Sequence, residues 1–318
     1  MNRRQLLVAG LGLVVAPRAF AGTVGGTPLA LVTADLESHV VAVDLASGRV
    51  SRRVPTIAGP RSIERVGASS ALVAHTSEGA VSLVDGRRLR VRRVVGGFAE
   101  PRYTALHPGG RVAYVTDSAA AGIVVVDVVH GEIIRRVPLG GPARHVSVAP
   151  QGTRLWVALG SKAEEVVALD VREAARPRIL RRLRPPYLAH DVGFSPNGAE
   201  VWVTSGDRGT IGIYDARSYR VRRRLPADAP PQHVTFIGGR AYVASGDDGT
   251  LHVHRLDGHR LRSATVPVGS YNVQQGWGVV LNPSLEQGTL TVVDRTGSVV
   301  RRETVARSSH DACFVMSA

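Results

Sequence analysis

Hydrophobic and polar positions follow one pattern along most of the chain, in short runs separated by turns rich in Gly, Pro, Asn and Asp. Within a run, branched and small residues alternate with period two, which is typical of β-strands. The clearest unit, residues 101–141, has the sequence PRYTALHPGG, RVAYVTDS, AAAGIVVVDVVHG, EIIRRVPLGG. Its first run ends in a Pro/Gly turn, its second carries an aromatic residue, its third ends in Asp and its fourth contains arginines. This order predicts four antiparallel strands.

The strand that ends in Asp recurs through the chain. Its last residues are Asp44, Asp85, Asp127, Asp170, Asp215, Arg255 and Asp294. The intervals between them are 41, 42, 43, 45, 40 and 39 residues. A repeat of this length is typical of propeller blades. The pattern therefore predicts an all-β fold, a seven-bladed β-propeller of four-stranded antiparallel blades.

The two ends of the repeat pattern complement each other. The segment TPLALVTADL, residues 27–36, matches the second strand of a blade but has no first strand before it. The C-terminal HDACFV, residues 310–315, resembles the first-strand segment HDVGF at residues 190–194. We therefore expect the C-terminal strand to join the first blade and close the ring, which removes two exposed sheet edges.

The third unit resembles the YVTN repeat of β-propellers. Tyr114, Val115 and Thr116 match its signature, Asp117 replaces its Asn, and IVVVD at residues 123–127 matches its third strand. The resemblance extends over essentially the whole mature chain and is strongest in the third to fifth units. It implies the propeller fold but no particular activity, because one fold serves many functions.

Residues 1–21 have the features of an export signal. A basic start with Arg3-Arg4 precedes a short apolar run, and Ala19-Phe20-Ala21 forms a cleavage site. The paired arginines resemble a twin-arginine signal. We expect a periplasmic or extracellular protein whose mature part, residues 22–318, is one propeller with no transmembrane span. The single cysteine, Cys313, excludes an intramolecular disulfide and is expected to be a buried strand residue.

Polar residues begin every first strand, and in a propeller these positions surround one mouth of the central channel. The seven pairs are Arg61-Ser62, Arg102-Tyr103, Arg144-His145, His190-Asp191, Gln232-His233, Tyr271-Asn272 and His310-Asp311. Convergent donors and acceptors of this kind can hold an anion, a metal or a cofactor. A structural alternative is that each histidine only hydrogen-bonds the backbone of an interblade link.

The sequence assigns no metal ligand. His190 and His310 belong to blades roughly opposite each other, where they could flank a ligand more easily than share an ion. His145 and His233 each lie one blade away from His190 and are better placed for a common contact. The chain has no HExxH, CxxC or CxxCH motif, so zinc-peptidase and covalent c-type haem chemistry lack their signatures. No cofactor is required, although a haem or a metal ion remains compatible with the ring.

Charged residues outside the ring have simple structural interpretations. The net charge is +14, and paired arginines recur on the fourth strands, where charge protects blade edges from pairing with other sheets. The same arginines could contact anionic surfaces. Asp247 and Asp248 in SGDDG could hold calcium, but a hairpin turn explains them. Nucleic acid is not expected as a partner, because basic grooves with aromatic stacking platforms are lacking.

These observations favour a non-catalytic binding scaffold, expected to be monomeric, that holds a protein or small molecule at the polar mouth. One alternative is a haem- or metal-binding redox protein, since YVTN-type propellers resemble the haem-binding propeller of periplasmic nitrite reductases and the propeller subunits of quinohaemoprotein dehydrogenases. The second is an enzyme similar to lactonase-like or streptogramin-lyase propellers, whose acid–base pattern is not found here. The sequence identifies no catalytic residue.

Overall fold

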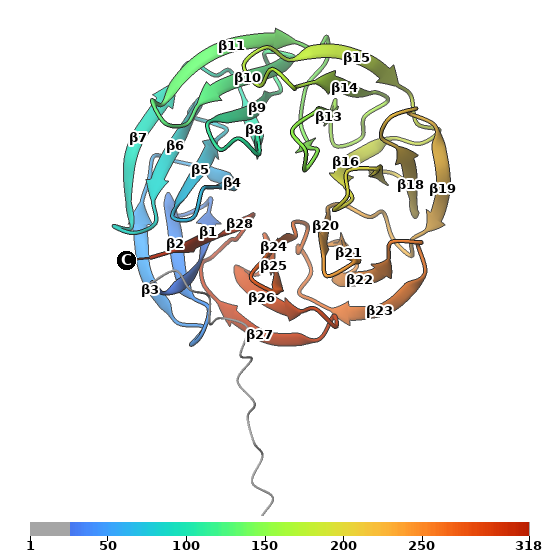
Figure 1. The fold of residues 1–318 in the computed structure, drawn as a ribbon. Coiled ribbons are helices and arrows are strands. Elements are labelled where there is room, and N and C mark those ends of the chain that lie inside the picture. Colours follow the sequence, from blue (N-terminus) through green and yellow to red (C-terminus); the bar gives the residue numbers. More distant parts are fainter. Residues whose placement is uncertain (1–25, 318) are drawn as a thin grey trace, which may run out of the picture.

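A computed structural model describes residues 26–317, and the export signal predicted over residues 1–21 lies outside this range. The described residues form 28 strands in seven four-stranded antiparallel sheets arranged around a ring (Figure 1). The structure thus confirms the predicted seven-bladed β-propeller. No helix between residues 26 and 317 is long and apolar enough to cross a membrane.

The blades follow one another in sequence order, except that blade 1 takes its innermost strand from the C-terminus. Blade 1 contains β28 (Ala312–Met316), β1 (Pro28–Ala34), β2 (His39–Asp44) and β3 (Val50–Pro55). Blade 2 contains β4 (Pro60–Val66), β5 (Ser70–His75), β6 (Ala80–Asp85) and β7 (Arg90–Gly96). Blade 3 contains β8 (Pro101–Leu106), β9 (Val112–Asp117), β10 (Gly122–Asp127) and β11 (Glu132–Pro138). Blade 4 contains β12 (Val146–Val148), β13 (Arg154–Ala158), β14 (Val166–Asp170) and β15 (Arg178–Leu183).

The remaining blades have the same construction. Blade 5 contains β16 (Ala189–Phe194), β17 (Glu200–Ser205), β18 (Thr210–Asp215) and β19 (Val221–Pro226). Blade 6 contains β20 (Val234–Ile237), β21 (Arg240–Ser245), β22 (Thr250–Arg255) and β23 (Arg260–Thr265). Blade 7 contains β24 (Gln274–Gly276), β25 (Val279–Pro283), β26 (Thr289–Asp294) and β27 (Val299–Thr304). The first strand of each unit lies nearest the centre and the fourth lies at the rim (Figure 1).

Ring closure occurs as the sequence predicts. Strand β28 pairs antiparallel with β1, with Ala30 opposite Phe314 and Leu31 opposite Cys313. Cys313 is free and buried in this strand. The Phe314 side chain is 2% exposed and meets Trp277 of blade 7 edge to face, with ring centroids 5.4 Å apart. The closing strand therefore completes blade 1 and also packs against blade 7.

The hydrophobic core lies between blades, because each sheet has a neighbour on both faces. Strands β9 and β10 are buried along their whole length, whereas the rim strand β15 is exposed except at its last residue. The predicted second-strand aromatics are the largest fully buried side chains, namely Trp156, Trp202, Tyr114 and Tyr242. The Tyr114 hydroxyl also donates a hydrogen bond to the Ala174 carbonyl of blade 4 at 3.0 Å. These residues join each blade to the next.

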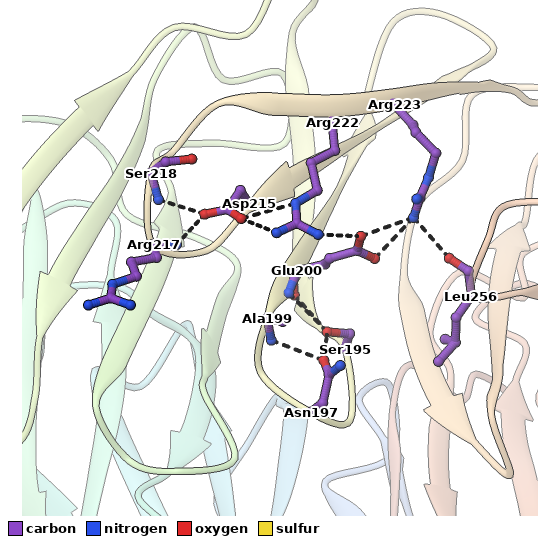
Figure 2. Close-up of polar contacts among 10 residues, drawn as sticks. All are labelled: Ser195, Asn197, Ala199, Glu200, Asp215, Arg217, Ser218, Arg222, Arg223 and Leu256. Carbon is purple, nitrogen blue, oxygen red and sulfur yellow. Dashed lines mark hydrogen bonds and ion pairs between the residues drawn. The ribbon is translucent and has the colours of Figure 1, made fainter.

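The recurring Asp at the end of the third strand closes the turn to the fourth. In blade 5, Asp215 Oδ1 accepts hydrogen bonds from the backbone N–H groups of Arg217 and Ser218, at 3.0 and 2.6 Å (Figure 2). A carboxylate that binds the backbone two and three residues ahead stabilises this type of turn. Asp44, Asp85 and Asp127 accept the equivalent pair of bonds. The repeat thus preserves Asp for a local structural reason.

Arginines on the rim strands connect neighbouring blades. Arg223 donates a hydrogen bond to the Leu256 carbonyl of blade 6 at 3.0 Å while it pairs with Glu200 of its own blade (Figure 2). Other pairs of donor and acceptor residues across blade boundaries are Arg92 and Val128, Arg93 and His130, Arg136 and Gly97, Arg182 and Leu139, Arg301 and Ala46, and Arg302 and Thr265. This interblade role of the rim arginines was not predicted from the sequence.

Candidate functional site

The polar pairs that begin the first strands are held in place by threonines of the second strands. Thr116 Oγ1 accepts a hydrogen bond from Tyr103 N–H at 2.9 Å and donates one to the Arg144 carbonyl of the next blade at 2.6 Å. The same arrangement joins Asp311, Thr33 and Arg61, and again Asp191, Thr204 and Gln232. The threonine of the YVTN-like signature therefore fixes the spacing between successive members of the ring.

The structure divides the predicted ring residues between two connected levels. A mouth cavity of about 270 Å³ is lined by the predicted residues Arg61, Tyr103, Arg144, His190, His233, Tyr271 and His310. Below it, a channel cavity of about 490 Å³ is lined by Tyr103, His145, Asp191, Asn272 and Asp311. Tyr103 borders both cavities and lies at the boundary between them. Arg102 lines neither cavity, because its guanidinium pairs with Glu100.

The arginines at the mouth differ in how their charge is compensated. Arg61 lies 3.8 Å from the Asp35 carboxylate, and Arg102 pairs with Glu100. Arg144, which is half-buried, has no ion-pair partner among residues 26–317, and its Nε has no hydrogen-bond partner there. Burial lowers the pKa of the Arg144 guanidinium, the adjacent Tyr103 hydroxyl partly offsets this effect, and the nearby Arg102 and Arg61 charges add to it. A guanidinium in this position carries an uncompensated positive charge beside the cavity.

Three histidines from adjacent blades converge at the boundary between the two cavities. The ring centroids of His145 and His190 are 4.4 Å apart, those of His145 and His233 4.7 Å, and those of His190 and His233 5.5 Å. One ring nitrogen of each lies within 4.8 Å of one ring nitrogen of both others. The Tyr103 ring packs against this cluster, with its centroid 4.4 Å from that of His145 and 6.1 Å from that of His310.

Two of the histidines at the mouth, His190 and His310, are oriented by a hydrogen bond at Nδ1. His190 Nδ1 lies 2.9 Å from the Ser161 carbonyl, and His310 Nδ1 lies 3.0 Å from the Arg61 carbonyl. His233 Nδ1 lies 3.3 Å from the Asp191 carboxylate, and its Nε2 lies 3.5 Å from the Tyr103 hydroxyl. A proton on Nδ1 that donates to these oxygens leaves the lone pair on Nε2.

His145 is the exception in this cluster. Its side chain is only 1% exposed, and neither ring nitrogen makes a well-directed hydrogen bond to the described residues. The nearby backbone of His190 raises the pKa of His145 slightly, but burial and the surrounding charges lower it by more. Buried polar atoms without a partner are uncommon and costly. His145 therefore has two unused ring nitrogens in the middle of the cluster.

The lowered pKa values of His145, His190 and His310 favour neutral imidazoles at pH 7. Burial, together with the neighbouring His233, lowers the pKa of His190 to about 3. Burial, followed by His190 and His233, lowers the pKa of His145 well below its usual range. Burial and the Arg61 charge do the same to the pKa of His310. The neutral form is the one that offers a lone pair to a ligand.

Asp191 and Asp311 link neighbouring first strands. Asp191 Oδ2 accepts the Val234 N–H of blade 6 at 3.1 Å, and Asp311 Oδ2 accepts the Ile63 N–H of blade 2 at 3.0 Å. Burial raises the pKa of Asp311 to about 7. Both carboxyl groups therefore have a structural role in addition to any contact with a ligand.

Several residues of the two cavities were not singled out from the sequence. Lys162 and Ser161 line the mouth cavity from the loop between the second and third strands of blade 4. Asp247, which the sequence indicated only as a turn residue or a calcium ligand, lines the same cavity from blade 6. Asp247 accepts hydrogen bonds from Gln232 Nε2 and the Tyr271 hydroxyl, both at 3.1 Å. Glu64 lines the channel, where burial raises its pKa to about 8. Glu64 is the fifth residue of β4, which begins at Pro60. It therefore lies farther along the channel than the polar pairs, and the comparison of strand starts did not extend to it.

No protein-family model matches the sequence, and no curated protein matches it significantly. Solved structures match over most of the chain. A functionally unknown protein from Desulfotomaculum acetoxidans DSM 771 has a TM-score of 0.77 at 12% identity, over 91% of this chain and 99% of that chain. A protein from Lactobacillus plantarum has a TM-score of 0.73 at 14% identity, over 92% of this chain and 100% of that chain.

A third similar structure is the dihydro-heme d1 dehydrogenase NirN in complex with DHE. Its TM-score is 0.63 at 18% identity, and the match covers 87% of this chain and 63% of that chain. At identities this low, the matches show that the propeller fold is shared, and they carry no information about activity.

Proposed function

We propose that this chain is an exported YVTN-type propeller that binds a small anionic ligand at its channel mouth without catalysing a reaction. The observation that carries this proposal is the Arg144 guanidinium beside the mouth cavity, which has no carboxylate partner among residues 26–317. A half-buried charge without a counter-ion is costly to maintain, and a bound anion would offset that cost.

The charges around the mouth cavity favour the same class of ligand. Arg61, Arg144 and Lys162 line it, and Asp247 is the acidic residue among the described lining residues. Asp247 is already engaged by Gln232 and Tyr271. Guanidinium groups bind carboxylates and phosphates through paired, charge-assisted hydrogen bonds, and a cavity of about 270 Å³ suits a small oxyanion.

Calorimetric titration of the chelator-treated mature chain with inorganic phosphate tests this proposal. A hydrogen bond to a charged group contributes about 1.5–3 kcal/mol, so we expect Arg144→Gln to weaken phosphate binding about tenfold or more. Arg102→Gln is the matched control, because Arg102 has the equivalent position one blade earlier but pairs with Glu100. Its affinity should stay within about twofold of the wild type. Absence of saturable phosphate binding, or an equal loss in both variants, would refute anion binding at the mouth.

A further inference from the structure

We propose that His145, His190 and His233 form a binding site for one divalent transition-metal ion, with a further coordination position open to the mouth cavity. The sequence placed these residues on adjacent blades but could not show that their rings meet. The structure brings one ring nitrogen of each within 4.8 Å of the other two. This site does not depend on anion binding at Arg144 and adds a different ligand class.

The geometry is close to that of a coordinated ion. Imidazole nitrogens bind zinc at about 2.0–2.1 Å, so three tetrahedral ligands stand about 3.4 Å apart. The nitrogens now within 4.8 Å of one another would have to approach by up to about 1.4 Å to reach that separation. Three imidazoles with no thiolate or carboxylate suit zinc, copper or nickel. Three protein ligands leave a position for water or another small ligand, and His190 and His233 border the mouth cavity from which it would enter.

The hydrogen bonds around the cluster suit metal binding. In metal-ligating histidines, the N–H of the second ring nitrogen commonly donates a hydrogen bond to a carbonyl or carboxylate. This bond orients the ring and directs the lone pair of the other nitrogen at the metal. His190 meets this condition through the Ser161 carbonyl. His233 Nδ1 lies 3.3 Å from the Asp191 carboxylate, and a metal ion at its Nε2 would replace the contact of 3.5 Å with the Tyr103 hydroxyl. His145 contributes a side chain that is 1% exposed and has no well-directed hydrogen bond. A metal ion would give that imidazole the partner that the protein itself does not supply.

The surrounding charges have opposing effects. The Arg144 guanidinium lies close enough to disfavour positive charge on His145 and His190. Asp191, 3.3 Å from His233, favours a cation. Arg61 and Asp311 are farther members of the same ring and act in opposite directions.

Cobalt titration of the full mature chain, purified without a polyhistidine tag and treated with chelator, tests this site. We expect visible absorption bands that saturate at one Co²⁺ per chain and disappear when Zn²⁺ is added. His145→Ala should weaken Co²⁺ binding about 100-fold or more, since even a loss of an orienting partner costs about 10–100-fold. Added Zn²⁺ should raise the unfolding temperature of the wild type and leave that of His145→Ala unchanged.

His310→Ala is the matched control, because His310 belongs to the same ring and is 4% exposed but is not part of the three-nitrogen cluster. We expect it to bind one Co²⁺ with affinity close to that of the wild type. If the wild type gives no saturable cobalt spectrum, or if His145→Ala and His310→Ala lose it equally, the metal site is refuted. The wild-type result alone decides the question if a variant fails to fold. Phosphate titration of the metal-free chain separates this outcome from a failure of anion binding.

Discussion

Replacing Glu64 by Gln tests whether the channel holds a neutral carboxyl group. Glu64 lines the channel from β4, and burial raises its pKa from 4.5 to about 8, with the Asp311 carboxyl adding to the effect. The folded state therefore holds this proton more tightly than the unfolded state. The contribution of Glu64 to stability is complete below pH 4.5 and is lost as the pH rises to about 8.

The size of the effect follows from the pKa change. At about 1.4 kcal/mol per pH unit, the full interval corresponds to about 5 kcal/mol. Because the side chain is half-buried and lines an open channel, we expect solvent screening to leave about 2–3 kcal/mol. Glutamine keeps the shape of the neutral acid but cannot ionise. Between pH 5 and pH 9, the free energy of unfolding of the wild type should therefore decrease by about 2 kcal/mol more than that of Glu64→Gln.

Urea unfolding at both pH values measures this difference. Glu303→Gln is the control, because Glu303 is exposed on the rim strand β27, and its profile should follow that of the wild type. Equal losses of stability in the wild type and Glu64→Gln, within about 0.5 kcal/mol, would show that Glu64 ionises without cost in the channel.

Two further predictions concern the ring itself. Thr204→Val removes the hydroxyl that accepts from Asp191 N–H and donates to the Gln232 carbonyl, and it should lower the free energy of unfolding by about 2 kcal/mol. Thr204→Ser keeps the hydroxyl and should lose clearly less in the same urea titration, so equal losses would contradict the role of that bridge. Phe314→Ala should lower the free energy of unfolding by about 4 kcal/mol, because it removes a buried ring that packs on Trp277 across the closing blade. A loss below about 1 kcal/mol in urea unfolding would mean that this contact does not secure the closing strand.

The repeat pattern was sufficient to predict the number of blades, the closing strand and the buried aromatics. Each of these depends on spacing along the chain, and spacing determines the angle at which a residue lies around the ring. Trp156 and Trp202 are fully buried for this reason, since their place in a second strand puts them between two blades.

Spacing does not determine height along the channel or the direction of a long side chain. Arg102 and Arg144 occupy equivalent positions, yet Arg102 turns to Glu100 and Arg144 borders the mouth cavity. His145 and His233 are both the second members of their pairs, yet His145 lines the channel and His233 lines the mouth. Such differences arise from local partners that lie far away in the sequence or in neighbouring strands. The three-histidine cluster therefore became evident only in three dimensions.

The closing blade also makes the starting point of the chain arbitrary in topological terms. Thr27 N–H donates to Ser317 Oγ at 3.2 Å, and Ser317 N–H donates to the Thr27 carbonyl at 3.0 Å. A short linker between these residues would join them covalently, and new ends could be opened in any turn between blades. Such circular permutants would keep the same ring and the same mouth while a different blade was assembled from distant segments. The order in which blades form during synthesis could then be varied without changing the folded structure.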